Sequence, residues 1–291
     1  MRRAVGAVVV LGLVLAGAAC SDDDEPEADD ATPTTATTAA PTTEATTTTV
    51  PPNLAVTITE EVEVDGLYRQ GLARLDDGWI FTSQWSLHRT DEDLTVVVED
   101  RDAMPDDLKA LGYDHIGDPD VFDDVLWVPL ESPAGKDTGE QLTARFDLET
   151  LAYVDSFPVA QHHNAFVAID DEGVVWSTDE FSDDTLVRYT VEGTTVTPLE
   201  PLVMDRTVER IQGADIAEGA LWLATDDDHN GVYRVDLGTG EVQDLGSMGR
   251  IPGEGEGIDA TDLPSGLLHT LVADEATVPM YLVHMSVAPE D

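Results

Sequence analysis

The stretch Ile211–Leu245, IQGADIAEGALWLATDDDHNGVYRVDLGTGEVQDL, indicates the fold of this chain. Its runs of alternating apolar and polar residues are interrupted at Glu218-Gly219, Asp226–Gly231 and Gly238–Gly240. Gly, Asp and Asn favour turns at these points because they accept positive φ or hydrogen-bond to their own backbone. Alternation between turns is typical of half-buried strands. The stretch therefore predicts an antiparallel meander with strands at Ala214–Ile216, Ala220–Thr225, Val232–Asp236 and Glu241–Leu245.

The same unit recurs along the chain at a regular interval. One anchor residue in each copy gives spacings of roughly 46, 47, 49 and 44 residues, within or near the period of about 40–50 typical of propeller blades. The anchors are Gly71, Gly117, Asn164, Gly213 and Gly257. After each anchor come a short apolar strand, a turn, and a second strand with a bulky apolar centre. The second strands are Trp79–Ser83, Val125–Leu130, Val174–Thr178, Ala220–Thr225 and Leu267–Val272.

Three of these second strands carry a Trp at a corresponding position, namely Trp127, Trp176 and Trp222. Large aromatic side chains account for much of the buried area in all-β folds. We therefore expect the three indoles to pack between neighbouring sheets rather than to bind a ligand.

The last copy lacks a strand, which indicates how the ring closes. After Gly257 only three good strands remain, whereas the alternating segment Ala55–Val64 has no partner in its own region. Closing a ring of sheets removes exposed strand edges, so we expect Ala55–Val64 to form the outer strand of the last blade. The prediction for residues 54–291 is an all-β, five-bladed β-propeller with four antiparallel strands per blade. Pro105–Leu111 predicts a short helix, and Glu131–Glu140 and Gly249–Glu256 predict rim loops.

The first twenty residues form a separate segment. Arg2-Arg3, an apolar run to Ala16 and the small residues before Cys20 are typical of a signal peptide. Gly17–Cys20 resembles the lipobox of bacterial lipoproteins, although the family usually has Leu where this chain has Gly17. The resemblance implies that Cys20 is lipidated and that the exported protein is anchored to the outer face of the cell membrane. Cleavage without lipidation, giving a secreted protein, is the alternative.

Residues 21–53 differ in composition from both neighbours. The acidic run SDDDEPEADD is followed by a segment of Thr, Ala and Pro with almost nothing to bury. Such a segment cannot offset the entropy lost on ordering, so a disordered linker is expected. Thr/Pro tracts also carry O-linked sugars in some proteins, and the sequence leaves that open.

The formal net charge is −46, and the linker contains only eight of the acidic residues. A domain this acidic is not expected to bind nucleic acid or an anionic membrane surface, because both need a positive face. Membrane contact is therefore expected through the lipid anchor alone, and the domain is expected to be a monomer. The acidity is compatible with cation binding, with a saline habitat, or with solubility alone.

Polar residues gather around the anchors, where the innermost strands of a propeller begin. We expect them to converge on one mouth of the central channel as a ligand or metal site. Imidazole and carboxylate groups there could hold a divalent cation such as calcium, or place a general base beside a substrate. A merely polar channel lining is the alternative. The candidates are Gln70, His115, Asp118, His163, Asn164, Gln212 and Glu256.

Other polar motifs favour structural roles. Asp226–Gly231 lacks the ligand spacing and terminal Glu of an EF-hand loop, so a turn is expected there. Ser83 and Ser86 are not framed by a Gly-x-Ser-x-Gly elbow.

The segment Gln70-Gly71-Leu72, with Asp77-Gly78 and Phe81–Ser83 after it, resembles the first blade of plant- and bacterial-type glutaminyl cyclotransferases, which are five-bladed propellers. The family has an acidic residue near the position of Thr82, so its activity does not carry over. Glu256-Gly257 is similar to the Glu-Gly pairs near the axis of lactonase and strictosidine-synthase-like propellers.

These patterns predict a cell-surface lipoprotein whose propeller binds a small ligand, a cation or a protein partner without catalysis. The alternative is a metal-assisted hydrolase, lactonase or cyclotransferase-like enzyme that uses Asp118, His163 and Glu256.

Overall fold

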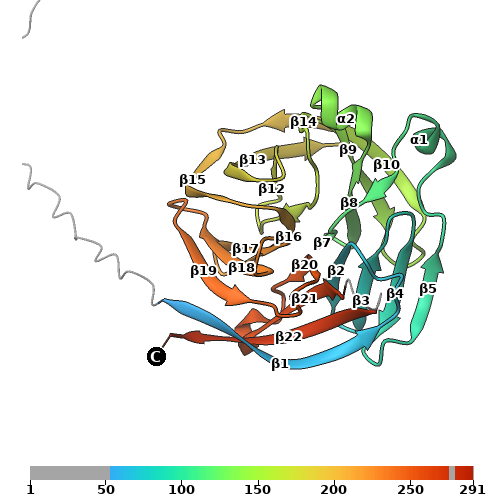
Figure 1. Cartoon of the computed structure of the whole chain (residues 1–291). Coiled ribbons are helices and arrows are strands. Elements are labelled where there is room, and N and C mark those ends of the chain that lie inside the picture. Colours follow the sequence, from blue (N-terminus) through green and yellow to red (C-terminus); the bar gives the residue numbers. More distant parts are fainter. Residues whose placement is uncertain (1–52, 275–278, 291) are drawn as a thin grey trace, which may run out of the picture. The chain divides into compact units, whose positions relative to one another are not determined.

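The computed structural model describes residues 53–274 and 279–290, which form five antiparallel sheets arranged in a ring (Figure 1). The prediction of a five-bladed β-propeller is confirmed. The predicted signal peptide, Cys20 and almost all of the predicted linker lie outside the described residues. Within the described part of the chain, no helix is both long and apolar enough to span a bilayer.

The blades follow one another along the chain. Blade 1 contains β2 (Gly71–Leu75), β3 (Gly78–Thr82), β4 (Leu87–Asp91) and β5 (Val96–Asp100), followed by α1 (Asp106–Ala110). Blade 2 contains β6 (His115–Ile116), β7 (Asp120–Phe122), β8 (Val125–Glu131), α2 (Pro133–Thr138), β9 (Gln141–Asp147) and β10 (Tyr153–Val159). Blade 3 contains β11 (Ala168–Ile169), β12 (Val175–Thr178), β13 (Asp183–Glu192), β14 (Thr195–Pro198) and β15 (Leu202–Val208). Blade 4 contains β16 (Ile211–Ala217), β17 (Ala220–Thr225), β18 (Gly231–Asp236) and β19 (Val242–Ser247). Blade 5 contains β20 (Glu254–Asp259), a short 3-10 helix (Leu263–Ser265), β21 (Leu267–Ala273), β22 (Met280–Pro289) and β1 (Leu54–Val64).

The ring is closed by β1, which pairs antiparallel with β22 (Figure 1). The pairing runs from Leu54 opposite Pro289 to Val64 opposite Met280. The first strand therefore supplies the outer strand of the last blade, as predicted. This arrangement covers an edge of β22 that would otherwise present unpaired backbone groups to solvent.

Two features of the rim differ from the expectation. The predicted loop Glu131–Glu140 contains the helix α2, because Ser132 accepts a hydrogen bond from Gly135 N at 2.9 Å and Pro133 starts the first turn. Gly139, with φ of 73°, ends this helix in the left-handed conformation. Blade 3 also has a fifth strand, β15, which pairs with β13.

The hydrophobic core lies between neighbouring sheets. Trp222, Trp176 and Trp127 are 1, 3 and 8% exposed, so the prediction that these indoles are core residues is confirmed. The indole N–H of Trp222 donates to Ala217 O and that of Trp176 donates to Asp170 Oδ2, at 3.2 and 2.9 Å. These bonds satisfy the polar end of two large buried side chains.

Candidate functional site

Asp118 lies at the centre of the ring and connects all five blades. Its backbone N–H donates to Ala165 O at 2.7 Å, which bridges blade 2 to the segment entering blade 3. Its carboxylate accepts backbone N–H groups from the innermost strands of the other three blades. The donors are Leu72 N at 3.0 Å, Ala214 N at 3.0 Å and Ile258 N at 3.4 Å. Asp118 is 0% exposed, and burial raises its pKa well above the usual range, although the three N–H donors oppose that rise.

Three of the anchor residues must be glycine because Asp118 occupies the space that a side chain would need. A Cβ on Gly71 would lie 2.4 Å from Asp118 Cα, and one on Gly213 would lie 2.5 Å from Asp118 Oδ2. A Cβ on Gly257 would lie 2.2 Å from Asp118 Oδ1. No side chain fits at these distances, so the glycines allow three strands to approach one carboxylate.

The residue before each of these glycines lies at a β-bulge. Arg69 N and Gln70 N both donate to Thr82 O, at 3.0 and 3.2 Å. In blade 4 the register passes from Ile211 to Gly213 across one step of the partner strand, so Gln212 is the extra residue. In blade 5 a similar shift falls between Gly255 and Ile258 and includes Glu256. Gln70, Gln212 and Glu256 therefore occupy equivalent positions in three blades, each at a bulge beside an axial glycine.

Glu256 is a buried acidic residue of blade 5. It is 3% exposed, and its carboxyl group makes no hydrogen bond or ion pair with any residue that the structure describes. Burial raises its pKa well above the usual range, and the nearby Glu254 and Asp118 raise it further. Arg69 lowers the pKa but does not offset these effects. Burial therefore favours the neutral form of Glu256, and a nearby positive charge would favour the ionised form.

A second polar cluster surrounds Glu131, at the end of β8. Glu131 is 2% exposed. Its Oε1 lies 2.5 Å from His163 Nδ1 and also accepts a hydrogen bond from Asn164 N at 2.6 Å. Its Oε2 lies 2.8 Å from Lys136 Nζ. Burial alone would raise the pKa of Glu131, but the contacts with His163 and Lys136 lower it to about 2. The adjacent His115 is mostly buried, and desolvation lowers its pKa.

The predicted site residues therefore belong to two groups. Gln70, Gln212 and Glu256 precede the three glycines that contact Asp118, whereas His115, His163 and Asn164 lie around Glu131. Asn164 also donates from Nδ2 to Leu142 O at 2.8 Å, so both its backbone and its side chain have structural partners. The trio Asp118, His163 and Glu256 is not among the described groups whose potential metal-ligand atoms lie within 4.8 Å of one another.

Residues that the sequence did not single out complete both the channel and the rim. Asp120, Asp215 and Asp259 each accept a backbone N–H from the next blade, from Ile169, Ala260 and Arg74 at 2.6, 2.7 and 2.7 Å. Burial, with repulsion among them, raises the pKa of each to about 7. The recurring spacing Gly213-x-Asp215 and Gly257-x-Asp259 is the signal that could have revealed this role.

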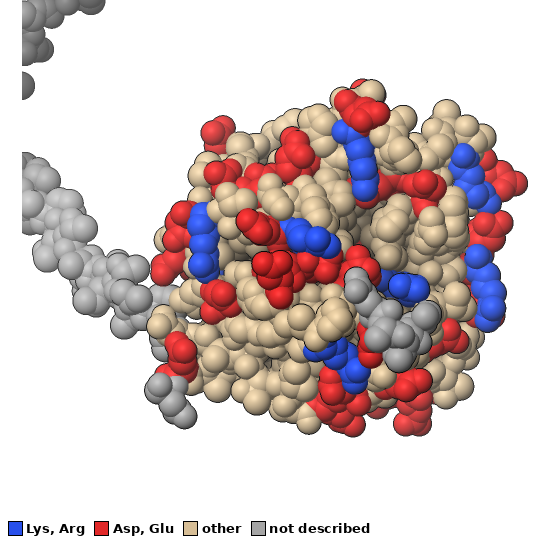
Figure 2. All heavy atoms as spheres, in the orientation of Figure 1, with Lys and Arg blue, Asp and Glu red and all other residues tan. Residues whose placement is uncertain are grey.

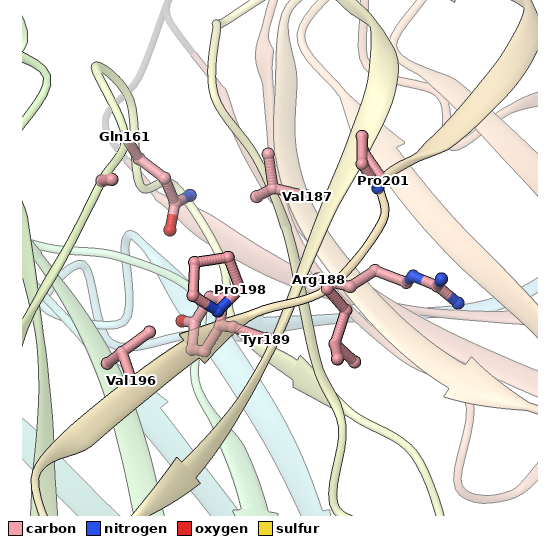
Figure 3. A pocket seen from close by; sticks show the side chains of 9 residues that line it. Gln161, Val187, Arg188, Tyr189, Val196, Pro198 and Pro201 are labelled. Carbon is pink, nitrogen blue, oxygen red and sulfur yellow. The ribbon is translucent and has the colours of Figure 1, made fainter. Parts of the chain in front are cut away.

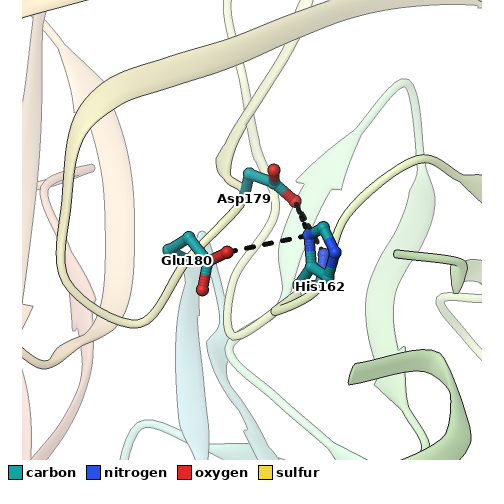
Figure 4. A group of neighbouring side chains, drawn as sticks. All are labelled: His162, Asp179 and Glu180. Carbon is teal, nitrogen blue, oxygen red and sulfur yellow. Dashed lines mark hydrogen bonds and ion pairs between the residues drawn. The ribbon is translucent and has the colours of Figure 1, made fainter. Parts of the chain in front are cut away.

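The rim beside the Glu131 cluster contains a cavity of about 300 Å³. It is lined by Lys136, His162, His163, Glu180 and Phe181. His162, Asp179 and Glu180 are the group of possible metal ligands that the described residues bring within 4.8 Å of one another (Figure 4). The face of the molecule seen in Figure 2 carries many acidic side chains, with a few basic ones among them near the centre.

Two further features have structural or apolar character. Asp227 accepts His229 N and Gly231 N within the predicted turn, at 3.1 and 3.0 Å, and its other oxygen accepts the Tyr233 hydroxyl at 2.6 Å. A largely apolar hollow of about 160 Å³ in blade 3 is lined by residues including Tyr189, Pro198 and Gln161 (Figure 3).

Comparison with known proteins supports the fold and nothing finer. No protein-family model matches the chain, and no curated protein matches it in sequence. One similar structure is a luciferin-regenerating enzyme, at 10% identity and a TM-score of 0.50, covering 75% of this chain and 77% of that one. Another is BamB from Moraxella catarrhalis, at 15% identity and a TM-score of 0.38, covering 75% of this chain and 58% of that one. The protein is a five-bladed β-propeller, a fold that hosts many unrelated functions.

Proposed function

We propose that this protein is a cell-surface lipoprotein whose propeller binds a small cationic ligand, in the simplest case a divalent ion such as calcium, at the mouth of the channel. The observation that supports this proposal is Glu256, a buried carboxyl group without a partner among the described residues. An uncompensated buried charge is costly, so a bound cation would stabilise the ionised form.

The chemistry of the mouth favours a hard cation. Glu256 and the neighbouring Glu254 provide carboxylate oxygens, and Gln70 and Gln212 occupy the equivalent bulge positions in other blades. Calcium and magnesium prefer carboxylate and amide oxygens. Asp118 is close enough to influence Glu256 electrostatically, but its own oxygens already accept backbone N–H groups.

The test is a thermal melt and a calorimetric titration of the purified protein with calcium and magnesium, each compared with EDTA. We expect the ion to raise the melting temperature of the wild type, since saturation at 100 times Kd adds about 2.7 kcal/mol. Glu256→Gln should remove this shift, and its stability in EDTA should match the wild type because Gln resembles the neutral acid. Binding should also release a proton and strengthen as pH rises.

Glu172→Gln is a matched control, because Glu172 is exposed on a turn of blade 3. It should keep the full response to the ion. A wild type that responds to neither ion, or a Glu256→Gln variant that responds like the wild type, would remove the support for this function.

The alternative function is a metal-assisted hydrolase or lactonase. The raised pKa of Glu256 favours it, because burial that favours the protonated form of a carboxyl group is typical of a general acid. The dispersed positions of Asp118, His163 and Glu256 count against their acting on one substrate. Assay of lactones and esters should show turnover that is lost in Glu256→Gln if this alternative holds.

The cellular location remains a proposal based on the sequence. If Cys20 carries lipid, the protein should fractionate with membranes and enter the detergent phase on phase separation. Cys20→Ser should move it to the soluble fraction. A wild-type protein found only in the soluble fraction would instead favour secretion.

A further inference from the structure

His162, Asp179 and Glu180 come together from two loops of blade 3 (Figure 4). His162 precedes the innermost strand of the blade, and Asp179 and Glu180 directly follow β12. The imidazole Nδ1 of His162 lies 3.1 Å from Asp179 Oδ1 and 3.7 Å from Glu180 Oε1. All three side chains are partly exposed, so a solute can reach them.

A hydrogen bond explains only part of this arrangement. One N–H on Nδ1 can bond to Asp179, whereas the Glu180 oxygen is beyond hydrogen-bonding distance. Ligand atoms about 2.1 Å from a tetrahedral metal ion are separated by roughly 3.4 Å. The two observed separations lie on either side of that value, and all three ligand atoms lie within 4.8 Å of one another.

The two loops are tied together by their backbones. His162 N donates to Asp179 Oδ1 at 2.7 Å, and His163 N donates to Asp179 O at 2.8 Å. These bonds hold Asp179 against His162 without any ion. Groups preorganised in this way are typical of metal sites, where outer hydrogen bonds orient the ligands.

The adjoining cavity of about 300 Å³ leaves room for a solute beside the cluster. His163 lines the same cavity as His162 and Glu180, and its Nδ1 contacts the ionised Glu131. Because a carboxylate only accepts, Nδ1 of His163 carries the proton. The opposite nitrogen, Nε2, is buried and has no hydrogen-bond partner within the described chain. Because this nitrogen is buried, His163 forms part of the cavity wall and does not offer a ligand atom to a solute.

We propose that His162, Asp179 and Glu180, beside this rim cavity, bind a divalent transition-metal ion of the zinc class. An imidazole ligand favours zinc, cobalt, nickel or copper over calcium and magnesium. Three protein ligands leave one coordination position for water or a small anionic ligand. The metal takes the lone pair of His162 Nδ1, and the single N–H of the neutral imidazole then lies on Nε2. This site differs in ligand chemistry from the mouth at Glu256.

Titration of the EDTA-treated, full-length protein with cobalt and zinc tests the proposal. Cobalt should produce a visible absorption band that saturates at one equivalent, and zinc should abolish that band by displacing the cobalt. His162→Gln and Glu180→Gln should each weaken zinc binding by at least about 10-fold, because losing a direct ligand costs no less than losing an outer partner that orients one. The Glu180 side chain is 62% exposed, so this variant is expected to fold even if His162→Gln does not.

His229→Gln is a matched control. The His229 imidazole lies 3.2 Å from Asp227 Oδ1, but these residues are not part of a described group of three ligands. His229→Gln and Glu256→Gln should both bind zinc as the wild type does, which keeps failure of this site distinct from failure of the mouth. The proposal is overturned if the wild type shows no saturable cobalt band, or if Glu180→Gln and His162→Gln bind zinc with wild-type affinity.

Discussion

Replacing Asp118 should destabilise the whole ring. Its carboxylate accepts N–H groups of Leu72, Ala214 and Ile258, and each of these residues is only 1% exposed. Asp118→Ala would leave three buried donors unpaired, at roughly 1–3 kcal/mol each, or roughly 3–9 kcal/mol together. That loss is comparable to the stability of a typical domain, about 5–15 kcal/mol.

Asp118→Asn should be less severe and is the variant to measure. The amide oxygen of Asn can accept one or two of the N–H groups, while its NH₂ group must face at least one remaining donor. We therefore expect a loss of about 1–3 kcal/mol, with the order Ala, then Asn, then wild type in increasing stability. Chemical unfolding followed by tryptophan fluorescence reports on the blade interfaces, where Trp222 is buried.

Asp137→Asn is a suitable control, because Asp137 is exposed on α2. It should change the free energy of unfolding by less than about 0.5 kcal/mol. If Asp118→Asn unfolds at the same denaturant concentration as this control, Asp118 does not hold the blades together.

Two further predictions concern the same axis. Gly213→Ala places a methyl group 2.5 Å from Asp118 Oδ2 and should lower the free energy of unfolding by about 2–4 kcal/mol. Gly193 lies at a turn with φ of 61° and open space around it, so Gly193→Ala should lower that free energy by only about 1 kcal/mol. An equal cost for both would contradict the close approach at the axis. Asp259 has a folded-state pKa raised to about 7, so its contribution to stability is complete below its unfolded pKa and is lost as pH rises through about 7. In the wild type the free energy of unfolding should therefore decline between about pH 4 and 7.5, and Asp259→Asn should make this decline shallower by up to about 1.4 kcal/mol per pH unit. A variant whose pH profile runs parallel to that of the wild type would refute the raised pKa of Asp259.

The sequence predicted the blades because their physical requirements repeat. Gly71, Gly213 and Gly257 recur since a carboxylate occupies the space of their missing side chains. Ala55–Val64 could be assigned to the last blade since the final copy lacked a strand. The helix predicted near Pro105–Leu111 is present as α1, with Pro before it and two Asp residues in its first turn.

The candidate site could be predicted only in part. Aligning the five sequence copies identified the polar residues beside the anchors. The alignment does not show which side chain fills the axis. Asp118 does so through contacts with residues up to 140 positions away in sequence. Glu131 meets His163 only when blades 2 and 3 pack together. Asp179 and Glu180 follow an ordinary strand, and only the path of the preceding loop brings His162 to them.

The pairing of β1 with β22 also constrains how the protein is made. The Thr59 hydroxyl donates a hydrogen bond to His284 O, 225 residues later in the sequence. During synthesis β1 is therefore made long before β22, the strand with which it pairs. Such distant contacts slow folding, and ring closure is expected to be its last step. Moving β1 to follow β22 would turn this longest-range pairing into a local hairpin, and that permuted chain should reach the same ring more quickly.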